Sequence, residues 1–189
     1  MAKKGLKHVV FAEKTSSGSY TNGKHVSPAV RVSINLTKAE GKDYGDDMVV
    51  DSESSVTGAD IEVELNHDEV DIYTFLLGHR EESVGNVVNF SVDDTPPIVG
   101  MGYVVNSTVT EGNRWVGIWV NEAKFSEPNN EANTKTDSIN FQHITLSGDM
   151  LIPEDGIWMK RKVFTTASAA IAWIDGLAGM ANTEGEGGN

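Results

Sequence analysis

The sequence predicts a mainly β fold, either a β-sandwich or a partly closed barrel, with a small helical cover. About seven to nine short runs rich in Val, Ile and aromatic residues are separated by turn residues. Two of these runs, 29–36 and 58–65, alternate strictly between apolar and polar residues. A third run, 114–125, is apolar on both faces, which predicts a strand that is covered on both sides.

The first third of the chain begins with a short apolar run at 7–12, which we predict to be a strand. Asn22-Gly23, in the polar stretch that follows, is a dipeptide typical of tight turns. In 29–36 the apolar residues fall on one face of the predicted strand and the polar residues on the other. This alternation predicts one face packed on a core and one face in water.

The run 58–65 repeats the alternation with acidic residues on its polar face. We expect Ile61, Val63 and Leu65 to point inward. If this run pairs with 29–36 as an antiparallel strand, one face of the sheet carries six polar side chains. They are Arg31, Ser33, Asn35, Asp60, Glu62 and Glu64.

The segment 37–57 between these two strands is long and mostly polar, and we predict a loop. Only Met48-Val49-Val50 is apolar enough for a brief strand inside it. A loop of this length in a compact domain is usually functional or mobile. A disordered surface insertion is the alternative interpretation.

A helix is predicted to follow at 66–77. Asn66 is a suitable N-cap residue, and Glu69 stands three residues later, as in a capping box. Val70, Tyr73 and Leu77 then share one face, and Gly78 is placed to end the helix. We expect this helix to form a lid on the open side of a sheet.

The middle of the chain is predicted to form a strand at 87–92 and then a β-hairpin of 98–105 and 114–125. The hairpin turn ends in Glu111-Gly112-Asn113. In its second strand, Trp115 and Trp119 lie on one face, and Val116, Ile118 and Val120 lie on the other. We predict that Tyr103, Trp115, Trp119 and Phe125 lie in the core or at a contact between subunits.

The last third of the chain contains two more predicted strands, 139–150 and 157–165, separated by a turn at Asp155-Gly156. The Ala-rich run 167–178 predicts a final helix. Residues 182–189 are rich in Gly and Glu and are expected to be disordered. We predict one domain at 1–181 followed by this tail.

The composition narrows the range of functions. The 189 residues include no cysteine, which excludes disulfides, thiolate metal sites and a cysteine nucleophile. The net charge of -13 argues against tight binding of nucleic acid, which requires Lys and Arg at the phosphates. No run is long and apolar enough for a membrane span or a signal peptide, so we expect no membrane contact.

No pattern of catalytic or metal-binding residues stands out. No two of the five histidines have metal-ligand spacing on a single element. Gly100-Met101-Gly102 begins a dinucleotide fingerprint, but Val105 occupies the third glycine position. We expect these glycines to let a bulky side chain or another backbone segment approach. We predict no enzyme, no catalytic residue, no metal and no cofactor.

Three segments are informative together: GMGYVV at 100–105, WVGIWVNEAKFSEPNNEANTKTDSINFQ at 115–142 and AAIAWIDGL at 169–177. They resemble the major tail proteins of long-tailed bacteriophages, most closely the phi13-type family from phages of Gram-positive hosts. The resemblance spans most of 52–177 in the order of its elements. Its most specific parts are KFSEP at 124–128 and TKTDSINFQ at 134–142.

The resemblance implies a structural virion protein, made in the bacterial cytoplasm and assembled into a phage tail. Members of that family form six-membered rings that stack into a tube, and their fold is a β-sandwich-like barrel with a flanking helix. The implied partners are other copies of the chain, a tape-measure protein in the lumen, and neck or terminator and distal tail proteins at the ends. DNA passes through the tube without specific binding.

The resemblance also suggests roles for individual residues. The six polar residues of the paired strands become candidates for the lumen face, where carboxylates repel DNA phosphates. The long loop is expected to reach the neighbouring ring, with 2–11 and the C-terminal tail as further candidates. The stacking residues within 42–50 are Lys42, Asp43, Tyr44, Asp46, Asp47, Met48, Val49 and Val50.

A different class of function remains open from the sequence. Four tryptophans, at 115, 119, 158 and 173, could stack against sugars. In that case the chain is a carbohydrate-binding β-sandwich of a phage tip or a cell surface. This alternative requires an exposed aromatic platform.

Overall fold

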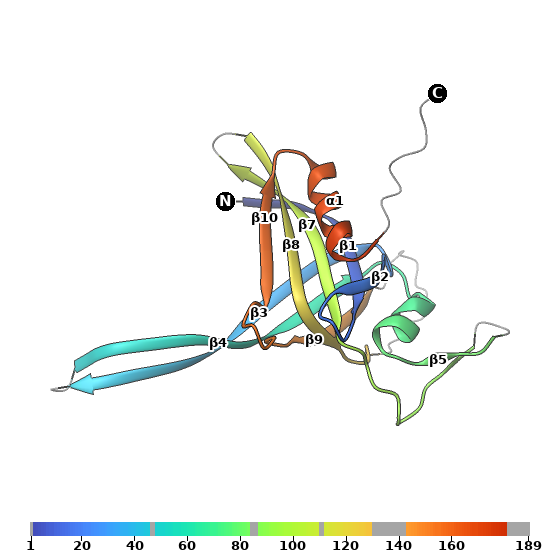
Figure 1. Cartoon of the computed structure of the whole chain (residues 1–189), viewed down its shortest axis with the longest axis horizontal. Helices are drawn as coiled ribbons and strands as arrows, with labels where there is room; N and C mark the ends of the chain where they lie inside the picture. Colours follow the sequence, from blue (N-terminus) through green and yellow to red (C-terminus); the bar gives the residue numbers. More distant parts are fainter. Residues whose placement is uncertain (1, 46–47, 84–86, 110–111, 130–142, 181–189) are drawn as a thin grey trace, which may run out of the picture.

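The structure is a computed structural model that describes residues 2–45, 48–83, 87–109, 112–129 and 143–180. Figure 1 shows a body of curved β-strands, an α-helix packed against it, and a long hairpin that projects from one side. The described residues are mainly in antiparallel strands, which confirms the predicted mainly β class. No helix in these ranges has the length and apolar character needed to cross a membrane.

The main sheet has eight strands, in the order β2-β1-β7-β8-β9-β4-β3, with β10 also paired to β8. Within the described residues, β5 and β6 form a second, two-stranded sheet. The strands are β1 (Ala2–Lys14), β2 (Tyr20–Lys24), β3 (Ala29–Gly45), β4 (Met48–Leu65), β5 (Arg80–Glu81), β6 (Val88–Asn89), β7 (Val99–Val109), β8 (Gly112–Phe125), β9 (Ile144–Met150) and β10 (Met159–Phe164). A π-helix (Ile72–Leu76) and α1 (Ala167–Leu177) complete the fold.

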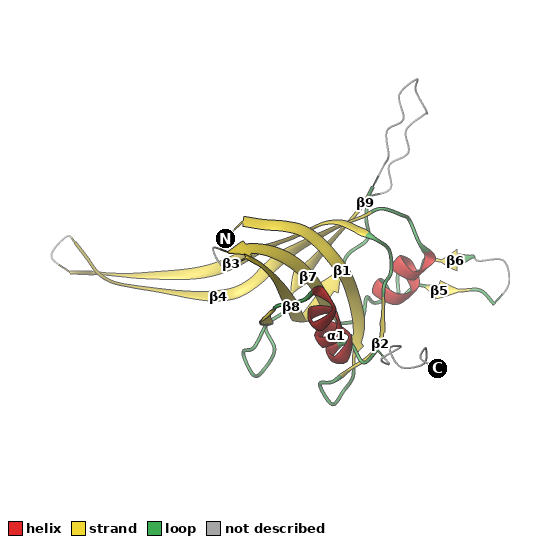
Figure 2. Ribbon diagram, turned by 90° about the horizontal axis from the view of Figure 1, so that it is seen from above, coloured by secondary structure: helices red, strands yellow, loops and turns green. Residues whose placement is uncertain are grey.

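The sheet divides at β8. One side of β8 pairs with β7, while its other side pairs first with β10, at 115–120, and then with β9, at 123–125. Two different strands therefore extend the two halves of β8, which allows the sheet to curve around a core (Figure 2). Among the described residues the end strands β2 and β3 are not hydrogen-bonded to each other, so no fully closed barrel forms.

Both faces of β8 are buried, as predicted. Ile118 and its alternate neighbours lie in the main core, together with residues of β4, β7, β9 and the π-helix. Trp119 lies on the opposite face, where it packs with Ala170, Ile174 and Ala178 of the α1 region. Tyr103, Trp119 and Phe125 are buried and Trp115 is partly buried, which places these four residues in the two cores of the monomer.

Gly100 and Gly102 on β7 make room for the Trp119 side chain. A Cβ atom at Gly100 would lie 2.5 Å from Trp119 Cζ2, and one at Gly102 would lie 2.6 Å from Trp119 Cε3. Real Cβ contacts are not this short, so larger residues would displace the indole. The prediction that these glycines admit a bulky side chain is confirmed.

The helix α1 matches the prediction to within one residue. Its N-cap is Thr166, whose Oγ1 accepts a hydrogen bond from the Ala169 N–H at 3.3 Å. Its buried residues, Ala170 and Ile174, are small or apolar and contact the Trp119 face of β8. The helix therefore covers the second core.

The predicted helix at 66–77 is wrong in type and length. Val70 and Asp71 are α-helical and lead into a five-residue π-helix, at Ile72–Leu76, whose N-cap is Asp71 rather than Asn66. Asn66 instead continues the end of β4, because its N–H donates to Pro28 O at 2.8 Å. Gly78 has a φ of +78° and follows the helix directly, as predicted.

The largest correction concerns 37–57, whose described residues, 37–45 and 48–57, form paired strands and not a loop. β3 and β4 remain hydrogen-bonded from their inner ends to the pair Gly45↔Met48. Met48-Val49-Val50 is thus the start of an 18-residue strand. A hairpin that projects into water needs backbone pairing but no apolar face, which is why its polar composition resembles that of a loop.

Several smaller boundaries also differ from the predictions. Asn22 and Gly23 lie inside β2, and the turn before it is closed by Thr15 N–H donating to Ser19 O at 2.8 Å. The strand expected at 87–92 is only the two-residue β6. The first strand is longer than 7–12, and β10 is slightly shorter than 157–165. Residues 110–111, 139–142 and 182–189 of other predictions lie outside the described ranges.

Candidate functional site

The six polar residues predicted to share one face do so. β3 and β4 are antiparallel, with Arg31 opposite Glu64, Ser33 opposite Glu62, and Asn35 opposite Asp60. Residues directly opposite each other in a sheet point to the same side. Their apolar neighbours on β4, Ile61, Val63 and Leu65, are buried on the other side, in the main core.

The neighbouring strands β9 and β8 extend this polar face, which sequence reasoning missed. Thr145, Ser147 and Asp149 of β9 lie opposite Glu64, Glu62 and Asp60. Lys124 at the end of β8 lies opposite Asp149. The signal was present in the sequence, because Ile144–Met150 alternates with its polar residues outward, but nothing in it indicated which strand β9 would join. We call these ten residues the polar face.

The polar face is acidic overall. Its charged residues are four carboxylates, Asp60, Glu62, Glu64 and Asp149, and two cations, Arg31 and Lys124, which gives a net charge of 2 − 4 = −2. Arg31 Nη2 lies 3.7 Å from Glu62 Oε2, so the cation is offset by an acid on the facing strand. Both side chains are largely exposed, so this pair adds little stability.

His143 approaches the polar face from the segment before β9. Its Nδ1 lies 2.8 Å from Glu64 Oε1. Both side chains are partly exposed. Hydroxyl, amide and charged groups thus dominate this surface.

The residues predicted to stack rings lie at the far end of the β3–β4 hairpin. We call residues 38–56 of this hairpin the arm. Lys42, Asp43 and Tyr44 belong to β3, and Met48, Val49 and Val50 belong to β4. Asp46 and Asp47 lie outside the described residues. Figures 1 and 2 both show the arm extending from the body with no other element beside it.

A buried histidine cluster was not predicted as a site. His79 is 8% exposed, and its Nδ1 lies 2.7 Å from Asp94 Oδ2. Its Nε2 is hydrogen-bonded to Glu127, which follows β8, and its ring packs on Phe90 at 4.3 Å between centroids. The three charged residues come from three separate segments, so their spacing in the sequence gave no signal.

Electrostatics favour a protonated His79. Burial alone lowers the pKa of His79, but the hydrogen bonds with Asp94 and Glu127 outweigh it and raise the pKa above the ordinary 6.5. The same contact with His79 lowers the pKa of Asp94. His79 thus clamps the 79–97 segment to the body. The described residues contain no group of three side chains arranged to hold a metal ion.

A wide cleft of about 920 Å³ lies between the turn at 15–19 and the segment 152–155. Its base holds an ion pair of Lys14 with Glu122, and the hydrogen bond with Glu122 raises the pKa of Lys14. Tyr20 donates from its hydroxyl to Asn121 O at 2.7 Å. The side-chain oxygen of Asn121 is buried without a hydrogen-bond partner in the described structure, but none of these groups is arranged as a nucleophile beside a base.

The tryptophans do not form an exposed platform in the monomer. Trp119 is fully buried, and Trp173 packs against Gly117 and Phe164. Trp115 is partly buried with Lys7 Nζ 5.1 Å from its ring centroid, and Trp158 packs against the main core. The carbohydrate-binding alternative therefore gains no support from the side chains that suggested it.

Comparison with known proteins does not add a relative. No family model matches this sequence, and no curated protein is significantly similar to it. The polar face, the arm and the edges of the sheet therefore carry what can be inferred about function.

Proposed function

We propose that this chain is the tail tube subunit of a long-tailed bacteriophage, which assembles into stacked, hexameric rings. One observation carries the proposal. The polar, acidic face lies on a sheet whose edge strand, β3, is unpaired on its outer side within the described residues and continues into an uncovered arm. One chain thus combines the three features that a tube requires. The polar face would line the lumen, the edge of β3 would meet the neighbour in the ring, and the arm would reach the next ring.

The polar face has the chemistry that a DNA channel requires. Duplex DNA carries one negative charge for about every 1.7 Å of its axis, so a basic lining would bind it tightly. A lining with a net charge of −2 per subunit, interrupted by Ser33, Asn35 and Ser147, repels phosphates and holds water instead. The genome could then slide through without specific contacts.

The free edges of the sheet favour assembly. An uncovered edge strand presents unpaired backbone groups to other chains, and joining copies around a ring removes such edges. Contacts of this kind are head-to-tail, so they close into a ring only at a fixed rotation. The arm then extends beyond the ring and reaches the adjacent one, with 2–11 and the C-terminal tail as further contacts.

The proposal implies a location and a set of partners. The chain belongs in the virion tail, and the tape-measure protein occupies its lumen before ejection. Neck or terminator and distal tail proteins cap its two ends. The protein itself has a structural role and performs no catalysis.

Electron microscopy of the purified protein tests this proposal. Rings or tubes with a central channel are the expected result, and their abundance should rise with protein concentration. A monodisperse monomer at about 1 mM protein would contradict the proposal. Glycan-array binding by such a monomer would instead support the carbohydrate-binding alternative.

A further inference from the structure

The exposed edge of β10 concentrates positive charge on an acidic protein. Lys160, Arg161 and Lys162 are consecutive and exposed, whereas the whole chain has a net charge of -13. Within the described residues β10 pairs only with β8, so its outer edge is free. Lys160 and Arg161 form no ion pair with any described residue, and Lys162 Nζ lies 5.3 Å from the Phe164 ring centroid. We call these three residues, with the exposed Val163, the basic edge.

An acidic surface with exposed apolar residues lies in the segment after β4. Phe90 is 60% exposed and Val92 is fully exposed. Four carboxylates of the same region are also exposed in the described structure, Asp68, Glu81, Glu82 and Asp93, and the exposed cation Arg80 lies beside Glu81 on β5. We call the four carboxylates, with Phe90 and Val92, the acidic surface.

Contacts place Asp68 and Glu82 near Phe90, and Glu81 lies opposite Val88 of β6. Tyr73 packs on Phe90 with 5.4 Å between ring centroids. Burial and a hydrogen bond with Asp68 raise the pKa of Tyr73 to about 12, so Asp68 lies beside the same ring. Asn89 Nδ2 donates to Glu82 Oε1 at 3.0 Å, which places Glu82 next to β6.

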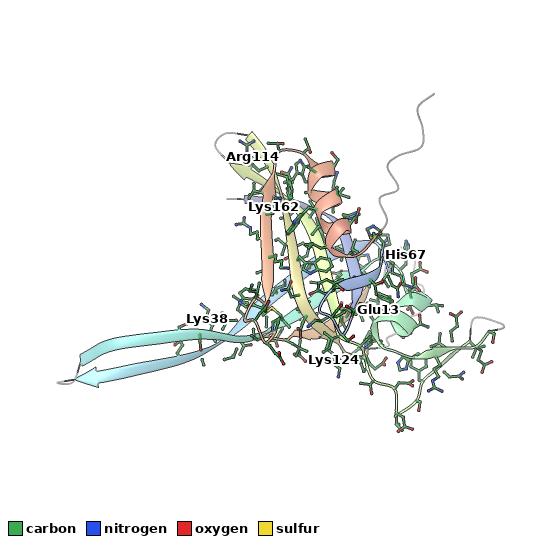
Figure 3. All side chains as sticks on the ribbon, in the orientation of Figure 1. Glu13, Lys38, His67, Arg114, Lys124 and Lys162 are labelled. Carbon is green, nitrogen blue, oxygen red and sulfur yellow. The ribbon has the colours of Figure 1, made fainter. Side chains whose placement is uncertain are left out.

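The basic edge and the acidic surface lie on opposite sides of the body. In Figure 1, β10 lies on the side of the body from which the arm projects, and β5 lies on the far side. Figure 3 labels Lys162 on the side of β10. It labels His67, which precedes Asp68 in the chain, on the other side. Two unlike, complementary surfaces on opposite sides cannot meet within one chain, but they can meet between two copies.

We propose that the basic edge of one copy binds the acidic surface of the next copy. This proposal rests on the proposed function, since it names the surfaces by which neighbouring subunits recognise each other. A second copy is the one occupant that suits both surfaces at once. A nucleic acid would fit the basic edge alone, and the net charge of the chain opposes it.

The chemistry of the two surfaces suits a specific contact. Lysines on a free edge strand prevent it from pairing with strands of other proteins. Carboxylates on the correct partner would neutralise these lysines, so the edge would accept that partner and no other. Phe90 and Val92 supply an apolar centre that the exposed Val163 can cover. Charges at the rim would steer the encounter, so salt should weaken it.

The absence of cysteine from the chain makes a direct contact test possible. Two single-cysteine variants, Val163→Cys and Val92→Cys, are mixed and treated with a short bis-maleimide linker. We expect a covalent heterodimer to be the main product, and to be at least tenfold more abundant than either homodimer. The matched control replaces Val92→Cys by Ser17→Cys, which is exposed on a different loop and should form little heterodimer.

Charge exchange tests the same contact without a linker. Variant A carries Lys160→Glu, Arg161→Glu and Lys162→Glu, and variant B carries Glu81→Lys, Glu82→Lys and Asp93→Lys. Each alone should need at least tenfold more protein to assemble, while their mixture and a chain with all six changes should assemble like the wild type. Charge-conserving variants, such as Lys160→Arg with Arg161→Lys, are the controls and should assemble normally.

The outcomes separate this interface from the proposed function. If variants A and B form tubes at the same protein concentration as the wild type, and the Val163→Cys and Val92→Cys variants give no cross-linked heterodimer, the proposed interface is wrong. The tube function would then still stand. The 163–92 product and charge rescue, with only open chains of subunits in the microscope, would support the interface and overturn the tube. Monomers at about 1 mM without any cross-linked product would overturn both.

Discussion

The two halves of the β3–β4 hairpin are built on the same ladder but are stabilised differently. In the inner half, 29–37 with 58–65, Ile61, Val63 and Leu65 are almost fully buried and β9 continues the sheet. In the arm, the described side chains at 38–41 and at 54–55 are all exposed. The inner half gains stability from burial, while among the arm residues whose burial is described only Val56, next to the inner half, packs partly against the main core.

A bulge marks the boundary between these halves. The register of the ladder shifts between Thr37 and Lys38, and Thr57 Oγ1 donates to Thr37 O at 3.3 Å beside the shift. Bulges bend and twist a strand pair, which is consistent with the departure of the arm from the body at this point. A two-stranded ribbon alone is barely stable in water, so the comparison implies that another surface completes the arm.

The largest effect should come from a core residue in the inner half. Ile61→Ala removes a fully buried side chain and should reduce the free energy of unfolding by about 2–5 kcal/mol. Lys38→Ala lies in the arm, where its side chain is exposed, and should change the free energy of unfolding by no more than about 0.5 kcal/mol. Urea denaturation followed by tryptophan fluorescence measures both. Equal losses for the two variants would contradict the contrast between the halves.

Shortening the arm should change assembly and leave the monomer intact. Glu40 lies opposite Ser54, so 41–53 can be replaced by Asn-Gly, which closes a two-residue hairpin turn. We expect the free energy of unfolding to change by less than about 1 kcal/mol, because no core side chain is removed. Tubes should disappear from electron micrographs. Tubes of normal length from the shortened chain would show that the arm does not stack rings.

The sequence predicted those parts of the fold in which local pattern and burial agree. The alternation of Arg31, Ser33 and Asn35 against Asp60, Glu62 and Glu64 predicted their common face, because side-chain direction in a strand follows from the sequence alone. The small residues Gly100 and Gly102 predicted a close approach, and Trp119 is the side chain that makes it. The α1 helix was likewise predicted by its Ala-rich composition.

The sequence failed where structure depends on distant partners. The arm resembles a loop, because strand pairing in water leaves no apolar pattern. Asn66 and Glu69 favour a capped helix, yet the Pro28 carbonyl takes the Asn66 N–H and the helix starts later. The His79 cluster and the addition of β9 to the polar face both join segments far apart in the chain, which a single sequence does not reveal.

The His79 clamp predicts a modest dependence of stability on pH. The folded-state pKa of His79 is raised, so its stabilisation is fully present below the unfolded pKa of about 6.5 and is lost as pH rises through the folded value. The pKa of Asp94 is lowered, so its contribution is present above about 3.8 and is lost as pH falls. The clamp should therefore stabilise most between about pH 4 and 6.5.

Urea midpoints measured from pH 4 to 9 test this clamp. The wild type should lose stability above pH 6.5, and His79→Gln should remove that part of the profile. His67→Gln is the matched control, because His67 is exposed and should leave the profile unchanged. An identical profile in the His79 variant would show that the clamp contributes no pH dependence.

The smallest effect on stability should come from reversing charges on the polar face. Changing Asp60, Glu62 and Glu64 to Lys should alter the free energy of unfolding by only about 0.5 kcal/mol per site, since these side chains are solvent-accessible. The charge of the face would change from −2 to −2 + 6 = +4 per subunit.

Transport through the tube should respond strongly to the same change. Assembled variant tubes should bind duplex DNA at low salt and slow genome release, with the binding lost as salt rises. The neutral variant, which combines Asp60→Asn, Glu62→Gln and Glu64→Gln, reaches only −2 + 3 = +1 and should bind DNA far more weakly. Fluorescence anisotropy of a labelled duplex measures the binding.

Since both variants lose the pairs of Glu62 with Arg31 and Glu64 with His143, a difference between them isolates the effect of charge from that of the lost contacts. Unchanged genome release from tubes of the Lys variant at low salt would mean that these carboxylates face outside solvent instead of a channel.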